Sequence, residues 1–178
     1  MAWPLFRLAY IWISQWFVLA TMYRHERVMW IRMNAMAALM TPLFFWPILP
    51  LPPQVATVVE IVGIVLVLAP YPLGIAARRA LGQANWQAPR ATGVPETITT
   101  AGPYGRIRHP LYLVMFVGSA GQFMVTGTWF CVPLILAFAA MAYTNALHDE
   151  RKIMTTSLAE AYAAYTREVP SRFVPGVL

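Results

Sequence analysis

Uncharged and mostly apolar segments alternate with short basic segments along most of this chain. Residues 8–23 carry no charge and form the first run with the composition of a membrane span, with Arg7 extending from it toward an interface. Residues 33–59 are also uncharged, but the prolines between residues 49 and 53 cannot continue a helix. The pattern therefore predicts a first span at 8–23, a second at 33–49 and a turn after it.

A third span is predicted over residues 55–77, with a kink where Pro70 and Pro72 interrupt its far end. A polar stretch follows, from residue 78 to residue 110. The next block, residues 111–147, contains 37 uncharged residues, which is too many for one membrane helix and enough for two short ones. We expect the break between these two spans at Gly127.

The last part of the chain, residues 149–167, places apolar residues at steps of three and four with charged residues between them. This spacing predicts an amphipathic helix at the membrane surface. The predicted fold class is therefore all-α: an integral membrane bundle of about five transmembrane helices with a C-terminal interfacial helix. We expect a single domain over 1–178, with three spans in residues 1–77 and the other two spans, with the surface helix, in 78–178.

Composition supports a membrane protein and excludes several other classes. Hydrophobic residues make up 59% of the 178 residues and charged residues 11%, which leaves too few polar side chains to coat a soluble globule. Cys131 is the only cysteine, so a disulfide framework or a cysteine-based zinc site cannot form within one chain, and we predict no metal site.

The distribution of basic residues predicts the orientation in the membrane. In the five-span arrangement, twelve of the thirteen lysines and arginines lie on one side, and only Arg7 lies on the other. The positive-inside rule then puts the C-terminus and all candidate functional residues in the cytoplasm, in a bacterial inner membrane. The net charge of +6 is explained by basic loops facing an anionic leaflet, so we predict no nucleic-acid partner.

Two polar segments carry the residues suited to chemistry. The first, residues 102–112, reads GPYGRIRHPLY and places Arg108 and His109 just before Pro110, which suits the first turn of a helix. The second begins at the end of the fifth span with Glu150 and continues to Arg172. We predict that folding brings these segments together on the cytoplasmic face, where one carboxylate and two arginines surround a ligand.

Together, these segments resemble the isoprenylcysteine carboxyl methyltransferase and phospholipid methyltransferase superfamily of small membrane enzymes. The first segment is similar to the family's GPY and RHP pattern with a following tyrosine, carried here by Gly102, Pro103, Tyr104, Arg108, His109, Pro110 and Tyr112. The second is similar in a glutamate, a tyrosine pair and a terminal signature, carried by Glu150, Tyr162, Tyr165, Val169, Pro170, Arg172, Phe173 and Pro175. Members often have two adjacent glutamates; here Glu150 is either the first of them, followed by Arg151, or the second, preceded by Asp149.

The resemblance implies a methyltransferase that uses S-adenosylmethionine and acts on a lipid-like or membrane-partitioned acceptor at the cytosolic boundary. It implies catalytic roles for Glu150, Arg108 and Arg172. The residues it implies for cofactor binding are Tyr104, Arg108, His109, Pro110, Leu111, Tyr112, Glu150 and Arg172. The methyl acceptor and the oligomeric state remain open, and membrane lipids are the other expected partners.

Simpler interpretations stand beside these roles. Arg108 could be a positive-inside anchor, His109 a helix cap, and Asp149 with Glu150 a solvated helix end. Two other function classes also fit parts of the sequence: an NADPH-dependent membrane sterol or enone reductase, and a helical membrane scaffold without enzymatic activity.

Overall fold

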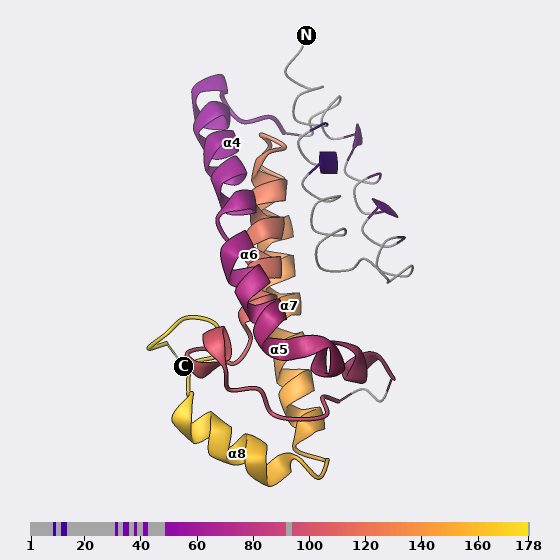
Figure 1. Ribbon diagram of the computed structural model, residues 1–178. Coiled ribbons are helices and arrows are strands. Elements are labelled where there is room, and N and C mark those ends of the chain that lie inside the picture. Colours follow the sequence, from indigo (N-terminus) through magenta and orange to yellow (C-terminus); the bar gives the residue numbers. More distant parts are fainter. Residues whose placement is uncertain are drawn as a thin grey trace. The chain divides into compact units, whose positions relative to one another are not determined.

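The computed structural model describes residues 49–91 and 94–177, with a few isolated residues nearer the N-terminus. In this part of the chain all the regular secondary structure is helical, apart from one isolated β-bridge between Pro50 and Thr128 (Figure 1). The elements are α4 (Pro53–Leu68), α5 (Tyr71–Ala91), the short 3₁₀ helix η1 (Gly102–Gly105), α6 (Pro110–Met124), α7 (Cys131–Ile153) and α8 (Ala159–Glu168). The predicted all-α class is confirmed for the described residues.

Two helical stretches in the described residues are long and apolar enough to cross a membrane. One runs from Pro53 to Trp86 through α4 and most of α5, over 34 residues, and the other is α7 with 23. Helix α6 is apolar but has only 15 residues, fewer than the roughly 20 that usually span a bilayer. The predicted spans at 8–23 and 33–49 lie almost entirely outside the described residues. A count of five spans therefore stays a prediction.

Both predicted interruptions are present. Helix α4 ends at Leu68 and α5 begins at Tyr71, so the helix is broken around Pro70. The uncharged block over residues 111–147 is interrupted around Gly127, in the turn that follows α6. The φ of Gly127 is 65°, a conformation that glycine adopts readily.

The third span was predicted to end at residue 77, but α5 continues through the polar stretch to residue 91. Its alanines, arginines and glutamines are good helix formers, which accounts for the extension. Gly82 adopts φ 70° and ψ 175° and divides α5 into two segments, and Figure 1 shows the change of direction. The Arg78 guanidinium steadies this bend, donating from Nη1 to the Gly82 carbonyl oxygen at 3.1 Å and lying 4.6 Å from the centre of the Trp86 ring.

The predicted surface helix over 149–167 is also corrected. Residues 149–153 belong to α7, and the separate helix α8 begins only at Ala159. Between them, the Thr155 hydroxyl donates to the Lys152 carbonyl oxygen at 2.8 Å and the Thr156 hydroxyl to that of Ile153 at 2.7 Å. Such local side-chain bonds compete with the continuing helix, so α7 ends here.

The chain divides into two compact units. Unit 1 contains residues 1–69 and 118–136, and unit 2 contains residues 70–117 and 137–178. Every predicted site residue belongs to unit 2. Within unit 1, α4 and α6 approach closely at two glycines: a Cβ added at Gly121 would lie 2.6 Å from the Gly63 carbonyl oxygen and 2.8 Å from the Val67 nitrogen.

We expect Gly121→Ala to destabilise the protein by about 1 to 3 kcal/mol, because the added methyl group meets backbone atoms that cannot rotate away. Gly118, three residues earlier on α6, has open space around its Cβ position. Gly118→Ala should therefore be neutral or stabilising by up to about 1 kcal/mol. Thermal unfolding in detergent checks both variants, and equal stabilities would show that the close approach does not constrain this crossing.

Candidate functional site

The two polar segments singled out in the sequence lie side by side in unit 2. The Arg108 backbone nitrogen donates to the Ser171 carbonyl oxygen at 2.9 Å, and the His109 nitrogen to that of Arg172 at 2.9 Å. Helix α6 begins directly afterwards at Pro110, as its fixed φ favours. The predicted meeting of these segments is therefore confirmed.

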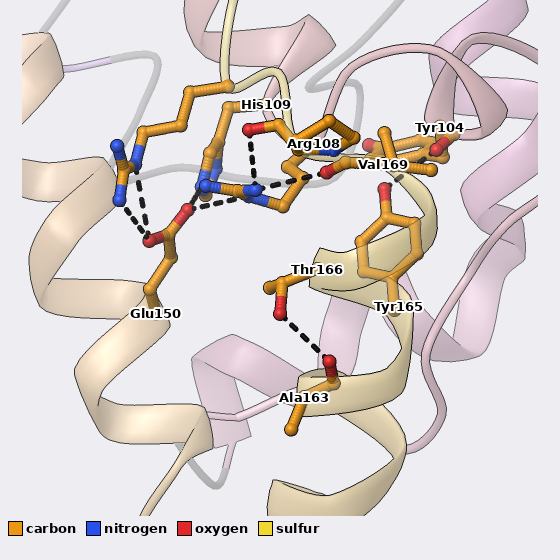
Figure 2. A network of polar contacts seen from close by, with 10 residues as sticks. Tyr104, Arg108, His109, Glu150, Ala163, Tyr165, Thr166 and Val169 are labelled. Atoms are coloured by element: carbon orange, nitrogen blue, oxygen red, sulfur yellow. Dashed lines mark hydrogen bonds and ion pairs between the residues drawn. The ribbon is translucent and has the colours of Figure 1, made fainter. Parts of the chain in front are cut away.

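The Glu150 carboxylate is the centre of a charged cluster. Its Oε1 accepts from Arg108 Nε at 3.0 Å and lies 3.0 Å from His109 Nε2 (Figure 2). Its Oε2 accepts from Arg172 Nη2 at 3.2 Å and from Arg172 Nε at 3.3 Å. The side chain is only 12% exposed, so Glu150 is a largely shielded ion-pair partner and not a solvated helix end.

Arg108 joins α7 to the C-terminal tail. Besides its ion pair with Glu150, Nη1 donates to the carbonyl oxygens of Val169 at 3.0 Å and Pro170 at 2.8 Å. The side chain is 6% exposed. Arg108 therefore bonds to groups inside the protein, whereas a membrane-surface anchor would extend toward lipid headgroups. Of its three guanidinium nitrogens, only Nη2 lacks a hydrogen-bond partner among the described residues.

The contact with Glu150 fixes the protonation of one nitrogen of His109. An ionised carboxylate can only accept, so Nε2 must carry a proton, and Nδ1 is the ring nitrogen that can accept one. The His109 ring contacts two aromatic rings, and its centroid lies 5.7 Å from that of Tyr112 and 5.9 Å from that of Phe173. His109 is thus oriented by both an ion pair and ring packing.

Two tyrosines of α8 lie beside this cluster. Tyr162 and Tyr165 are buried together with Val169, and the Tyr165 hydroxyl donates to the Tyr104 carbonyl oxygen at 2.7 Å (Figure 2). Burial raises the pKa of Tyr165 to about 12 and the pKa of Tyr162 and Tyr104 further. These phenols therefore stay neutral at physiological pH, and Tyr162 and Tyr165 pack together in the interior of unit 2.

A pocket of about 200 Å³ opens beside this cluster, and we call it the tyrosine pocket after the four tyrosines in its wall. These are Tyr104, Tyr112, Tyr162 and Tyr165. Arg108, His109 and Leu111, which the resemblance assigns to a cofactor, also line it. Five of the eight residues expected to bind a cofactor therefore share one pocket, and Pro110 starts the helix that carries two of them.

A second pocket, of about 510 Å³, contains the remaining charged residues, and we call it the arginine pocket. Glu150, Arg151 and Arg172 line it, and it shares Arg108 and Tyr162 with the tyrosine pocket. The structure thus brings all the predicted catalytic residues together, but it divides the predicted cofactor residues between two neighbouring pockets.

Asp149 is a site residue that the sequence left as part of a helix end. It lines the tyrosine pocket, whereas the adjacent Glu150 lines the arginine pocket. Its Oδ2 accepts from the Tyr112 hydroxyl at 2.8 Å. The signal in the sequence was its place beside Glu150, in one of the two alignments of the family's glutamate pair.

Asn85 is a second residue that the sequence analysis missed. Its Nδ2 donates to the hydroxyls of Thr97 and Thr99, both at 2.9 Å, and its Oδ1 accepts from the backbone nitrogens of Glu96 and Thr97 at 3.0 Å. These bonds hold one wall of the tyrosine pocket, which includes Ile98. Nothing in the sequence pattern marks an asparagine in a helix for this role.

Metal binding is not indicated by the described residues. Within residues 49–91 and 94–177, no group of three or more histidine, cysteine, aspartate or glutamate side chains is placed to hold a metal ion. The absence of a metal site in the whole chain stays a prediction.

Comparisons with known proteins place this geometry in a family. The chain is 33% identical over 78 residues to the cobalt-zinc-cadmium resistance protein CzcN of Cupriavidus metallidurans. That match covers 43% of this chain and only 35% of the relative. No solved structure matches. The phospholipid methyltransferase family model matches residues 57–161, which is more than half of the chain and includes Arg108, His109 and Glu150 of the charged cluster. This protein therefore belongs to the phospholipid methyltransferase family, and the resemblance seen in its motifs is confirmed.

Proposed function

We propose that this protein transfers a methyl group from S-adenosylmethionine to a hydrophobic acceptor in the membrane. Family membership supports a membrane methyltransferase. The observation that carries the finer proposal is the tyrosine pocket, in which the residues expected to bind the cofactor meet the carboxylate of Asp149. We further propose that the site faces the cytoplasm of a bacterial inner membrane.

The residues of the tyrosine pocket fit the chemical groups of this cofactor. S-adenosylmethionine combines an apolar adenine ring with an ammonium group, ribose hydroxyls and a carboxylate. Asp149 would accept from the ammonium or the ribose, and Leu111 with the ring of Tyr104 would contact adenine. When bound, the cofactor supplies a methyl group activated by a positively charged sulfur. We therefore propose residues 78–178 as the cofactor-binding half of a single domain.

The charged cluster would then hold its arginine and histidine side chains in place and exclude water from the reacting groups. Glu150 already accepts from three side chains, so we propose that it orients Arg108, Arg172 and His109 and does not itself take a proton from the acceptor. An amine or hydroxyl acceptor must lose a proton, and His109 Nδ1 is the basic nitrogen available for it. A carboxylate or thiolate acceptor needs no base.

Ligand-dependent stabilisation of the purified full-length chain tests the proposal. S-adenosylhomocysteine at about 100 times its dissociation constant should add about 2.7 kcal/mol to the stability of the native state, and NADPH should add nothing. Stabilisation by NADPH alone would favour a reductase, and no response to either ligand would favour a scaffold.

Asp149→Asn locates the cofactor within the site. The amide can still accept from the Tyr112 hydroxyl, so we expect the fold to remain while the affinity for S-adenosylhomocysteine falls about tenfold or more through loss of the charge. Glu160→Gln, on the exposed surface of α8, is the matched control and should leave the affinity unchanged. Calorimetry that found equal affinities in Asp149→Asn and the parent would move the cofactor out of this pocket.

Orientation is tested separately by reporter fusions. A reporter joined after Gly127 should be external, and one joined after Leu178 should be cytoplasmic. The reason is that twelve of the thirteen basic residues lie on the side of the membrane that holds the C-terminus. A cytoplasmic signal at Gly127 would contradict the proposed orientation without affecting the assignment of the pocket.

A further inference from the structure

Asn85 lines the tyrosine pocket, yet its polar atoms are already used within the protein. A carboxamide has two N–H groups that donate and an oxygen with two lone pairs that accept. Both donors of Nδ2 are taken by the hydroxyls of Thr97 and Thr99. Both lone pairs of Oδ1 are taken by the backbone nitrogens of Glu96 and Thr97. The residue is only 7% exposed, so any influence of Asn85 on a ligand has to pass through the residues that it holds.

Those residues form one wall of the pocket, and we call residues 95–99 the wall segment. Four of the five line the tyrosine pocket: Pro95, Thr97, Ile98 and Thr99. The segment has no helix or strand of its own. Among the described residues, the bonds with Asn85 are the only hydrogen bonds that it makes, and its other attachment is the packing of Ile98 against Tyr162 and Tyr165. Asn85 is therefore the polar anchor of this wall.

The part of α5 that carries Asn85 is itself fixed. Arg78 donates from before the bend to the carbonyl oxygen of Gly82, so the two parts of the helix are joined across it. The first part of α5 also contacts η1, since a Cβ added at Gly102 would lie 3.4 Å from the Cβ of Ala80. Because η1 carries another residue of the pocket, α5 relates the wall segment to a second part of the same site.

We propose that Asn85 is a positioning residue for the ligand of the tyrosine pocket, which holds the wall segment in the conformation that binds S-adenosylmethionine. This inference rests on the proposed function of that pocket. Ordering five residues of irregular chain on binding would oppose association, because each loses backbone freedom. A wall that is already in place removes this cost. Asn85 thus contributes to affinity without contacting the ligand.

The first measurement is the affinity of the purified full-length chain for S-adenosylhomocysteine, by calorimetry in detergent. Asn85→Ala removes all four bonds. If the released wall adopts the binding conformation in about one molecule in ten, the dissociation constant rises about tenfold. Asn85→Asp should keep most of the affinity, because its oxygens can accept from both backbone nitrogens and from threonine hydroxyls turned to donate.

Gly121→Ala is the matched control for a general loss of stability. The added methyl group meets backbone atoms of α4 in unit 1, and Gly121 does not line the tyrosine pocket. This variant should be less stable than the parent and should bind S-adenosylhomocysteine equally well. A weaker affinity in Gly121→Ala, equal to that of Asn85→Ala, would mean that the effect follows stability and would overturn the positioning role.

The second measurement is hydrogen exchange of the ligand-free protein, followed by mass spectrometry on the peptide that covers residues 94–101. Exchange should be faster in Asn85→Ala than in the parent, because the backbone N–H groups of Glu96 and Thr97 lose their acceptor. Asn85→Asp should exchange at nearly the rate of the parent. This readout needs no ligand and no methyl acceptor.

The two measurements together decide the inference. Weaker binding by Asn85→Ala with unchanged exchange would mean that Asn85 contacts the ligand directly, and faster exchange with unchanged binding would mean that the wall does not set the affinity. Either result would overturn the positioning role. Failure of the parent itself to bind S-adenosylhomocysteine would instead contradict the proposed function, and exchange would still show whether Asn85 holds the wall segment.

Discussion

Replacing Glu150 with glutamine is expected to destabilise the protein by about 3 to 5 kcal/mol and to abolish measurable methyl transfer. The carboxylate accepts from Arg108, His109 and Arg172, and the amide of glutamine turns one acceptor oxygen into a donor facing another donor. Arg108, with a side chain 6% exposed, would keep a buried charge without its partner. Breaking a buried pair in this way costs far more than the intact pair contributes.

The experiment measures the free energy of unfolding by denaturant titration in mixed micelles, together with initial rates of methyl transfer. Glu150→Asp keeps the charge on a shorter side chain and should retain part of both quantities. Glu160→Gln makes the same chemical change on an exposed position and should alter stability by less than about 0.5 kcal/mol.

The kinetic result separates positioning from catalysis. A positioning role predicts that stability and cofactor affinity fall together with the rate. A general base predicts a 100- to 10,000-fold slower reaction in a protein of unchanged stability and affinity. That second outcome would contradict the role that we propose for Glu150.

Much of this arrangement could be predicted because its signals are local. Pro110 marks the start of α6, and Gly127 marks the break after it. The charge pattern predicts only that Arg108 and Glu150 lie on the same side of the membrane. Each of these depends on steric or electrostatic rules that act over a few residues. The all-helical fold follows from the long apolar runs in the same way.

Other features were missed, two of them because they depend on tertiary contacts and one because hydropathy alone did not reveal it. Asp149 and Glu150 are neighbours in sequence, but successive residues of a helix point about 100° apart, and the elements packed around α7 decide which pocket each one lines. The role of Asn85 depends on a loop 11 to 14 residues away. The extension of α5 through a polar stretch depends on propensity, which hydropathy does not measure.

Replacing Arg108 with alanine is expected to have an effect of similar size, a loss of about 3 to 5 kcal/mol with detachment of the C-terminal tail. The substitution removes the bonds to Val169 and Pro170 as well as one partner of Glu150, and it leaves these acceptors unpaired in a buried place. Arg172→Ala should cost less, about 1 to 2 kcal/mol, because that side chain is 27% exposed and, among the described residues, bonds only to Glu150.

Limited proteolysis reports the tail directly, since residues after Val169 should become cleavable in Arg108→Ala well below the temperature at which the parent unfolds. Arg106→Ala is the control two residues earlier, where the side chain is exposed and lines neither pocket. Arg108→Lys keeps the charge without the planar guanidinium group. Its tail should be cleaved more readily than that of Arg106→Ala and less readily than that of Arg108→Ala, because one ammonium group cannot reproduce bonds from both Nε and Nη1. A tail as protected in Arg108→Ala as in Arg106→Ala would mean that the backbone pairing of residues 108–109 with 171–172 suffices, and that Arg108 is left free to serve a ligand.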